Sequence, residues 1–258
     1  MSVLHVLGSG AAYSDGGRTT TMLALDAASG VVVVDCGGDV VQRLLAHGLD
    51  PLRVTALIVT HEHADHVGGL PLMLERLWLA GRRTPLPVIG IEPAVAQAVR
   101  LHDVFDTSEW PEYAGIAPRI VDQTPSTVVL DDADWRLTGA PGVHAVPVIG
   151  LRIEPKDGGI VVAYSCDTAY EPAIVELARG AGLLLHEAAG GPSPIHASAC
   201  DAARVALEAD AGRLVLVHLP PGFDETSEEV ARARRTFPAL EVGFDGARYP
   251  LTATGSSA

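Results

Sequence analysis

The sequence has few basic residues and an excess of acidic ones. Its 258 residues include 18 Lys and Arg against 32 Asp and Glu, which gives a formal net charge of −14. Proteins that bind long nucleic acids use Lys and Arg to neutralise phosphates, so this balance argues against a large polyanionic partner. Divalent metals bound at one site would offset part of the negative charge locally.

Cysteine is also scarce, and long apolar runs are absent. Cys36, Cys166 and Cys200 are an odd number at wide spacings, which is typical of a reduced cytoplasm rather than of a disulfide framework. Apolar runs such as Val31–Val34 have the length of a strand and not of a membrane span. The N-terminus lacks the basic and apolar segments of a secretory signal. We therefore expect a cytoplasmic protein that has no membrane partner.

Short apolar runs of strand length come in two series, and each series closes with helical patterns. The segment 106–125, rich in proline and polar residues, is expected to join the two halves. We predict one α/β domain over residues 1–258, a four-layer αββα sandwich whose two sheets face each other with helices outside. The expected strands lie near 3–7, 22–26, 31–35, 54–60, 127–130, 135–138, 144–147, 151–154, 160–164, 183–185 and 214–217, and the expected helices near 40–47, 67–79, 93–102, 171–179, 197–209 and 227–236.

The densest group of metal-binding side chains lies where a valine-rich strand gives way to a helix. It reads Thr60-His61-Glu62-His63-Ala64-Asp65-His66. Imidazole is a preferred ligand of Zn²⁺, and a carboxylate suits a second, harder position. The end of a strand is also where open α/β folds place their ligands. Four candidate ligands at this place predict a metal site in preference to a polar turn with satisfied histidines.

This segment has the HxHxDH pattern, and the chain resembles the metallo-β-lactamase-fold hydrolases. Three further motifs match in order, with His144 in Gly-Val-His-Ala-Val, Asp167 in Tyr-Ser-Cys-Asp-Thr and His218 in Leu-Val-His-Leu. The resemblance implies two zinc ions, with manganese or iron as alternatives, at the sheet edges. Metals about 3.5–4 Å apart share a bridging hydroxide and clamp the attacked and departing oxygens. It assigns His61, His63 and His144 to one metal, Asp65, His66 and His218 to the other, and Asp167 to both.

Within this family the chain is most similar to ribonuclease Z and its short relatives. The resemblance implies that His196, paired with Glu187, protonates the departing oxygen, and that Asp65 orients the attacking hydroxide. It also implies a possible homodimer, formed through the surface near the first metal helix. Asp35, at a strand end, is a plausible acceptor for the N–H of a ligand histidine. The motifs that carry the likeness are Leu7-Gly8-Ser9-Gly10, Asp35-Cys36-Gly37, Gly69-Leu70-Pro71, Leu185-His186-Glu187-Ala188 and Ile195-His196-Ala197-Ser198.

Two features depart from the ribonuclease Z pattern. Those enzymes carry a long inserted arm that grips tRNA between the third-motif histidine and the bridging aspartate. Here only 22 residues separate His144 from Asp167, enough for an ordinary hairpin. Together with the net charge, this disfavours folded tRNA as the substrate. In addition, Cys166 stands where that family usually has glycine, and a small buried side chain is a more typical role for it than a metal contact.

The remaining polar candidates have ordinary explanations. Alternation along the chain points Glu62 away from the metals. Arg18, in a loop that borders the site in this branch, either binds a substrate anion or is solvated. Arg76, Arg82 and Arg83 form a modest basic strip, which we interpret as a solvated face in preference to a phosphate contact. Structural or exposed positions are expected for His5, His47, His102 and His186.

The function predicted from these residues is a metal-dependent hydrolase, a phosphodiesterase acting on small or short substrates. The His196 and Glu187 pair favours phosphodiesters because alkoxide leaving groups need a proton. The first alternative is a hydrolase of the same fold that acts on carboxyl esters, lactones or thioesters, in which His196 only lines the pocket. The second is a metal-binding module without catalytic activity.

Overall fold

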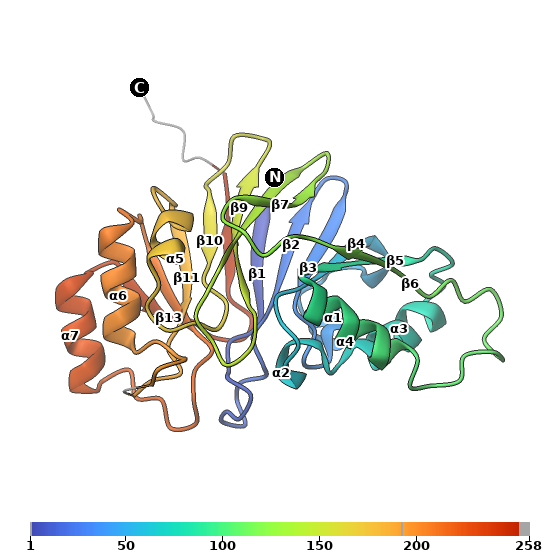
Figure 1. The fold of residues 1–258 in the computed structure, drawn as a ribbon, viewed down its shortest axis with the longest axis horizontal. Helices are drawn as coiled ribbons and strands as arrows, with labels where there is room; N and C mark the ends of the chain where they lie inside the picture. Colours follow the sequence, from blue (N-terminus) through green and yellow to red (C-terminus); the bar gives the residue numbers. More distant parts are fainter. Residues whose placement is uncertain (1, 192, 253–258) are drawn as a thin grey trace.

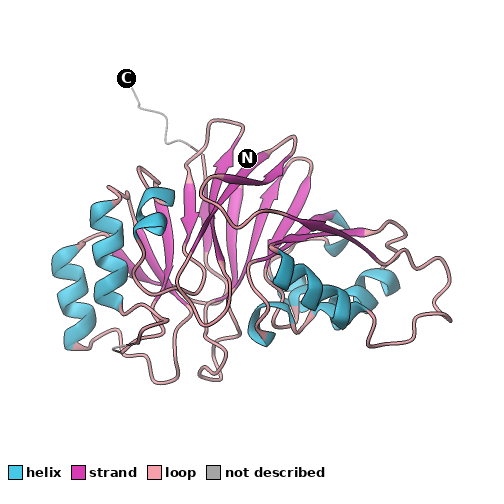
Figure 2. Cartoon of the chain, in the orientation of Figure 1, coloured by secondary structure: helices cyan, strands magenta, loops and turns pink. Residues whose placement is uncertain are grey.

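The protein folds into two seven-stranded sheets that pack face to face, with helices on the outer sides (Figures 1 and 2). This arrangement is seen in a computed structural model that describes residues 2–191 and 193–252. It is the predicted αββα sandwich. No helix among the described residues is long and apolar enough to cross a membrane.

The first sheet is antiparallel on one side and parallel on the other. Strands β14, β1, β2 and β3 pair antiparallel, whereas β3, β4, β5 and β6 pair parallel. Helices α1, α3 and α4 lie on its outer side (Figure 1). In sheet order the strands are β14 (Arg248–Pro250), β1 (Val3–Gly8), β2 (Met22–Ala27), β3 (Gly30–Val34), β4 (Val54–Val59), β5 (Leu86–Gly90) and β6 (Ile116–Ile120). The helices of this half are α1 (Val40–Ala46), a 3₁₀ turn Pro51–Arg53, α2 (Ala64–Val67), α3 (Leu70–Leu79) and α4 (Glu92–His102).

The second sheet repeats this division. Strands β7 to β10 pair antiparallel, and β10 to β13 pair parallel. In sheet order its strands are β13 (Leu240–Val242), β12 (Leu214–Val217), β11 (Leu183–Glu187), β10 (Val162–Tyr164), β9 (Ile149–Pro155), β8 (Trp135–Pro141) and β7 (Thr127–Asp131). Its helices are α5 (Pro172–Leu177), α6 (Ala199–Glu208) and α7 (Glu228–Thr236).

The core has two layers, and strand β12 shows how the sequence divides between them. Successive side chains of a strand point to opposite faces of the sheet. Val215 and Val217 therefore pack between the two sheets, whereas Leu214 and Leu216 pack against the helices of the second half. Each of these side chains is fully buried, and such burial contributes roughly 1.5–3 kcal/mol per large apolar side chain.

The helix expected over 67–79 is two helices, because Gly68 and Gly69 interrupt it. α2 ends at Val67 and α3 begins at Leu70. At Gly69 the chain packs so tightly that a Cβ would lie 2.2 Å from the carbonyl oxygen of Gly38. This close contact requires a glycine and turns the chain between the two helices.

The strand expected over 144–147 is wrong, since these residues form an irregular loop between β8 and β9. The N–H of Val143 donates to Thr168 Oγ1 (2.9 Å) rather than to a neighbouring strand. Pro147 has no N–H to contribute to a ladder. The alternating apolar pattern of this segment therefore serves a loop that carries His144.

The segment that links the two sheets is shorter than the predicted segment 106–125. Within that segment β6 pairs with β5 and so belongs to the first sheet. The chain passes to the second sheet over residues 121–126. At the other end of the sequence, β14 returns to the first sheet beside β1, so the two sheets do not correspond exactly to the two halves of the chain.

Two histidines expected to be structural form a buried pair between β1 and α1. His5 Nδ1 and His47 Nδ1 lie 3.0 Å apart, and both residues are buried. Burial lowers the pKa of both imidazoles, and that of His47 falls to about 4. Both rings are therefore neutral in the folded protein at neutral pH.

We expect this pair to make the protein less stable in acid. The unfolded chain takes up protons at His5 and His47 below about pH 6.5, whereas in the folded chain both imidazoles resist protonation and His47 does so down to about pH 4, so the free energy of unfolding falls as the pH falls through this window. Denaturant unfolding between these pH values should show a shallower pH dependence for His47→Gln than for the unmodified protein. Equal slopes would contradict the role given to the pair.

Candidate metal centre

The seven predicted ligand residues meet at the ends of strands from both sheets. His61, His63, Asp65 and His66 follow β4 and enter α2. From the second sheet, His144 lies in the β8–β9 loop, Asp167 follows β10 and His218 follows β12. The HxHxDH segment and the three distant motifs therefore form one cluster.

The first group of donor atoms belongs to three histidines. His63 Nδ1 lies 3.0 Å from His61 Nε2 and 3.1 Å from His144 Nε2. Nitrogens bound tetrahedrally to zinc at about 2.0–2.1 Å would be about 3.3 Å apart, so this spacing fits one ion. His61 is fully buried, and burial lowers its pKa to about 2, which keeps the imidazole neutral and able to bind a metal.

The second group combines two carboxylates and two histidines. Asp65 Oδ2 lies 3.3 Å from both His66 Nε2 and His218 Nε2. Asp167 Oδ2 lies 3.4 Å from His66 Nε2 and 3.2 Å from His218 Nε2. Burial would raise the pKa of Asp65, but the hydrogen bond from His218 and the neighbouring His66 imidazole lower it below its usual range. The carboxylate therefore stays ionised, as a metal ligand must.

Asp167 lies between the two groups. Its Oδ2 is 3.9 Å from both His61 Nε2 and His144 Nε2, in addition to its contacts with the second group. Among residues 2–191 and 193–252, His66 Nε2 and Asp167 Oδ1 are buried without a hydrogen-bond partner. Buried polar atoms are normally paired, and these two belong to side chains that also converge with other donors, which is the arrangement expected of metal ligands. The donor set thus fits two adjacent metal ions with Asp167 between them.

Two of the predicted ligand histidines are oriented from behind by hydrogen bonds. His66 Nδ1 donates to Asp35 Oδ2 (2.9 Å), which confirms the contact predicted for Asp35. His144 Nδ1 donates to the carbonyl oxygen of Ile195 (3.0 Å). Each bond places the proton on Nδ1 and leaves Nε2 facing the cluster.

Three non-glycine residues next to the cluster adopt left-handed backbone conformations. Asp35, Cys166 and His218 have φ values of 61°, 54° and 55°. Each stands one or two residues after a strand of the parallel region. Such residues cost of the order of 1–3 kcal/mol each and persist where the surroundings require them. Here they turn the chain sharply at the strand ends, so that side chains of both sheets reach one cluster.

His196 and Glu187 form a hydrogen-bonded pair beside this cluster. His196 Nδ1 donates to Glu187 Oε1 (2.9 Å), and the His196 ring stacks at 5.7 Å on that of the predicted ligand His218. The hydrogen bond to Glu187 raises the pKa of His196, and burial raises that of Glu187. The backbone N–H of Thr168 also donates to Glu187 Oε1 (2.6 Å), which fixes the carboxylate.

Comparison with known proteins identifies the family. A model of the β-lactamase superfamily domain matches residues 31–219. Ribonuclease Z of Mycolicibacterium paratuberculosis is 32% identical, over 98% of this chain and 99% of its own length. Ribonuclease Z of Methanothermobacter thermautotrophicus is 27% identical, over 100% of this chain and 99% of its own length. The chain belongs to the ribonuclease Z family of the β-lactamase superfamily.

Solved structures agree with this assignment at the level of the fold. YhfI from Bacillus subtilis, a metallo-β-lactamase fold protein, superposes with a TM-score of 0.79 at 23% identity, over 96% of this chain and 98% of its own. The short form of human tRNase Z superposes with a TM-score of 0.78 at 22% identity, over 98% and 100%. A diphosphatase of the PhnP family gives 0.72 at 20% identity, over 97% and 98%.

In this ribonuclease Z family member the arginines left open by the sequence are engaged within the protein. Arg18 is half-buried and donates from Nη1 to Ser9 Oγ (2.7 Å) and to the carbonyl oxygen of Gly243 (2.6 Å). The three arginines of the basic strip, which was expected to be a solvated face, also contact partners within the protein. Arg76 pairs with Asp39 (2.8 Å), Arg82 donates to the carbonyl oxygens of Val54, Thr84 and Pro85, and Arg83 contacts Glu112 and the carbonyl oxygen of Trp78.

The other candidates take up the ordinary positions expected for them. Glu62 points toward Arg100, with an Oε2 to Nη2 distance of 3.9 Å. His186 is fully buried and donates from Nδ1 to the carbonyl oxygen of Glu187 (2.8 Å). His102 contacts the carboxylate of Asp103 (2.7 Å). Neither histidine faces the cluster of donor atoms.

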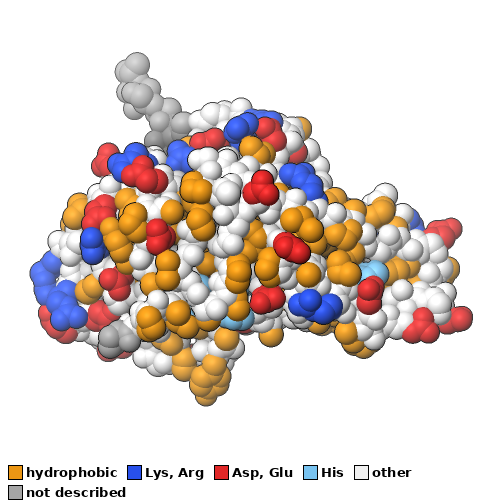
Figure 3. All heavy atoms as spheres, in the orientation of Figure 1, with side chains coloured by type: hydrophobic (Ala, Val, Ile, Leu, Met, Phe, Trp, Pro, Cys, Tyr) orange, Lys and Arg blue, Asp and Glu red, His pale blue; other side chains and the backbone are white. Residues whose placement is uncertain are grey.

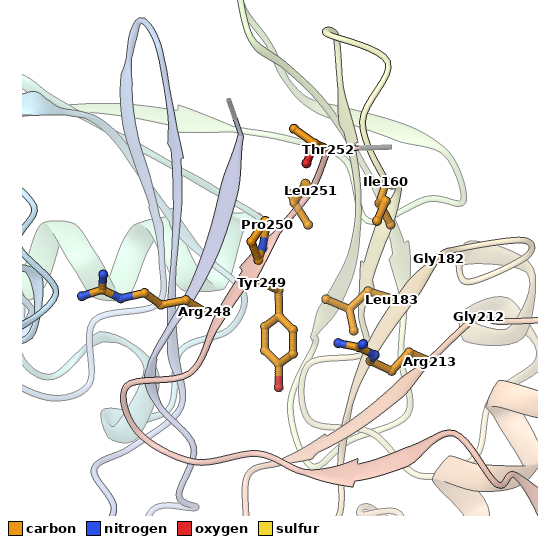
Figure 4. Close-up of a pocket in the computed structure, with 10 residues that line it drawn as sticks. All are labelled: Ile160, Gly182, Leu183, Gly212, Arg213, Arg248, Tyr249, Pro250, Leu251 and Thr252. Carbon is orange, nitrogen blue, oxygen red and sulfur yellow. The ribbon is translucent and has the colours of Figure 1, made fainter. Parts of the chain in front are cut away.

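A cavity of about 550 Å³ lies at the opposite end of the sheets from this centre (Figure 4). Gly182, Leu183 and Arg213 line it, close to the starts of β11 and β12, whereas Asp167 and His218 follow the ends of β10 and β12. Tyr249 lies in its middle, between Arg213 and Arg248 (Figure 4). The cavity is therefore separate from the metal centre.

Residues that sequence analysis did not single out support the centre. Thr60 lies in the metal motif, yet its hydroxyl had no assigned role; it bonds to both carboxylate oxygens of Asp35, at 3.0 and 2.9 Å. Thr168 joins the His144 loop to Glu187 through Val143. A small polar residue beside a ligand motif carries no distinctive signal, so only the fold reveals these contacts.

Gly37 packs directly against the backbone of Asp65 in the predicted metal loop, so a larger residue at this position is expected to disturb the loop. A Cβ there would lie 1.7 Å from the carbonyl oxygen of Asp65, so Gly37→Ala has to displace the loop that carries the ligands. We expect the free energy of unfolding to fall by roughly 2 kcal/mol or more, together with weaker zinc retention. Thermal unfolding and metal analysis measure both effects. Gly17→Ala, which meets nothing within 4 Å, is the matched control and should leave both unchanged.

Proposed function

We propose that this chain is a phosphodiesterase that uses two zinc ions, with manganese or iron as alternatives, and acts on small or short substrates. The observation that carries the proposal is the His196 and Glu187 pair beside two converging groups of metal-binding atoms. An active site for ester cleavage needs an activated water and, for a poor leaving group, a proton donor. The first requirement is supplied by a metal pair and the second by His196.

In this proposal His61, His63 and His144 hold one ion, Asp65, His66 and His218 hold the other, and Asp167 lies between them. When bound, the ions supply positive charge for the attacked phosphate and a water of lowered pKa. Asp65, whose carboxylate lies beside His66 and His218, is assigned in this proposal to orient this water. The two carboxylates offset part of the positive charge of the ions. The neutral histidine ligands do not, so positive charge remains to attract the phosphate.

His196 is placed to donate a proton to the departing oxygen. Its Nδ1 is bound to Glu187, so its Nε2 is the atom available to a substrate. The ring lies 4.9 Å from that of His144 and 5.7 Å from that of His218, next to ligands of both ions. Glu187 stabilises the imidazolium form and fixes the ring. This arrangement matches a general acid for an alkoxide leaving group.

Three observations support a small or short substrate. The β9–β10 connection is a short hairpin turn, and the aligned ribonuclease Z of Methanothermobacter spans 311 positions against the 258 residues here. The arginines near the first metal helix are engaged with partners in the protein. On the face shown in Figure 3, acidic and basic side chains are interspersed without a broad basic region. A long RNA would have few cations to neutralise its phosphates.

The named relatives support phosphodiester chemistry. The curated relatives are ribonucleases Z, and structural neighbours include a tRNase Z and a diphosphatase. The same fold also occurs in an isothiocyanate hydrolase, at a TM-score of 0.61 and 15% identity. Because the fold also supports other hydrolytic reactions, cleavage of carboxyl esters, lactones or thioesters is the alternative that the experiments must distinguish from the proposal.

The first test is hydrolysis of bis(p-nitrophenyl) phosphate by zinc-loaded protein. We expect turnover that disappears in Asp167→Ala, because removing the shared carboxylate releases metal from both positions. Metal analysis of the same samples shows whether the ions are bound. Two bound ions without turnover would contradict the phosphodiesterase proposal and point to carboxyl ester, lactone or thioester substrates. Two tightly held ions in Asp167→Ala would contradict the bridging assignment.

A leaving-group comparison tests His196 directly. His196→Ala should retain both metals and slow cleavage of a dinucleotide, whose leaving group is an alkoxide, by roughly 10²–10⁴-fold. Cleavage of bis(p-nitrophenyl) phosphate should change much less, because p-nitrophenolate departs without a proton. Glu187→Gln, which keeps a hydrogen-bond acceptor for the ring, should give a smaller loss with the same leaving-group pattern. Equal losses for both substrates would exclude His196 as the acid.

A further inference from the structure

Cys166 occupies a position that favours glycine and is not accounted for by the proposed function. It follows β10 with φ of 54°, in the left-handed region where a side chain strains the backbone. It is also fully buried, directly before Asp167. A glycine would avoid the strain, so the thiol is retained at a cost in conformational free energy.

The thiol contacts the side of His61 that faces away from the cluster. Cys166 Sγ lies 2.9 Å from Thr60 Oγ1 and 3.5 Å from His61 Nδ1. His61 Nε2, by contrast, is the atom that approaches His63 and the carboxylate of Asp167. The sulfur therefore lies against the Nδ1 side of the His61 ring, although it also comes within 4.8 Å of one nitrogen of His61 and one of His66.

The chemistry of the neighbouring groups determines where each proton lies. Asp35 is a hydrogen-bond acceptor for Thr60, so the hydroxyl proton of Thr60 points to its carboxylate. The lone pairs of Thr60 Oγ1 then accept from Cys166 S–H and from His61 Nδ1–H, which lies 3.3 Å away. In this arrangement every donor has an acceptor, and His61 carries its proton on Nδ1.

We infer that Cys166 is a positioning residue for the first metal position: its thiol donates to Thr60 and packs behind His61, which keeps the Nε2 of that histidine directed at the ion. The inference rests on the proposed assignment of His61 as a ligand. It predicts an effect confined mainly to the first position. His66, which belongs to the second position, is held by Asp35 directly.

The test measures zinc affinity separately at the two positions in the full-length protein. A His218→Ala background reports the first position and a His144→Ala background the second, each by competition with a chromophoric chelator. Cys166→Ala should weaken the first position by roughly tenfold or more, and Cys166→Ser, which keeps a donor, by less than about threefold. The second position should change little in either variant.

Two further measurements separate positioning from other roles. Cys166→Gly removes the thiol and relaxes the backbone, so it should fold normally yet lose first-position affinity as Cys166→Ala does. Nuclear magnetic resonance of ¹⁵N-labelled histidine should show His61 protonated on Nδ1 in the unmodified protein. In Cys166→Ala that resonance should shift or broaden, and in Cys166→Ser it should recover.

Several outcomes would overturn the inference. Equal losses for serine and alanine, or equal losses at both positions, would reduce Cys166 to a packing role. Unchanged affinity would remove it altogether. A thiolate-to-metal charge-transfer band in the cobalt-substituted protein, absent in Cys166→Ser, would make the sulfur a ligand itself. Failure of the unmodified protein to bind any metal would refute the ligand assignment together with the role of Cys166.

Discussion

The arrangement of the metal-binding loop depends on one buried carboxylate, that of Asp35. It accepts hydrogen bonds from the backbone and hydroxyl of Thr60 and from His66 Nδ1. An ionised carboxylate without these partners would be costly to bury, so the loop after β3 and the loop after β4 are stable only together. The backbone reinforces this coupling, since Cys36 N donates to the carbonyl oxygen of His66 and Gly69 N to that of Cys36, both at 2.7 Å. Metal ligands are thereby positioned by contacts that exist without a metal.

The sequence reveals the centre unevenly, and the reason is topological. The segment His61–His66 places four candidate ligands within six residues, so its density alone predicts a metal site. His144, Asp167 and His218 are single polar residues in apolar surroundings, and only the order of the family motifs connects them. Their meeting point depends on how the strands of the second sheet are arranged, which local residue patterns do not encode. The contacts that orient the predicted ligands, such as the one between Thr60 and Asp35, cannot be predicted either from residue patterns or from the order of the motifs.

The fold shows the same division between local and long-range information. The valine-rich strands β3 and β4 were recognisable because their burial on both faces requires continuous apolar residues. β6 was missed because it is an edge strand with exposed residues and Pro118 in its middle, a position that only an edge tolerates. Residues 144–147 have the alternation of a strand, yet they form a loop, and the N–H of the preceding Val143 donates to Thr168 rather than to a ladder. In that loop a tertiary contact overrides local propensity.

The charges of the protein bear on how the proposed centre selects its substrates. Two divalent ions and the His196 imidazolium would bring five positive charges to a place where Asp35, Asp65, Asp167 and Glu187 already supply four carboxylates. The excess attraction for an anion is therefore small beyond the immediate contact distance, and the net charge of −14 repels polyanions from farther away. Under these conditions the protein distinguishes between substrates through the groups that contact the scissile bond, namely the ions and His196. A short phosphodiester needs only those contacts, whereas a long RNA would need a cationic surface that the engaged arginines do not provide.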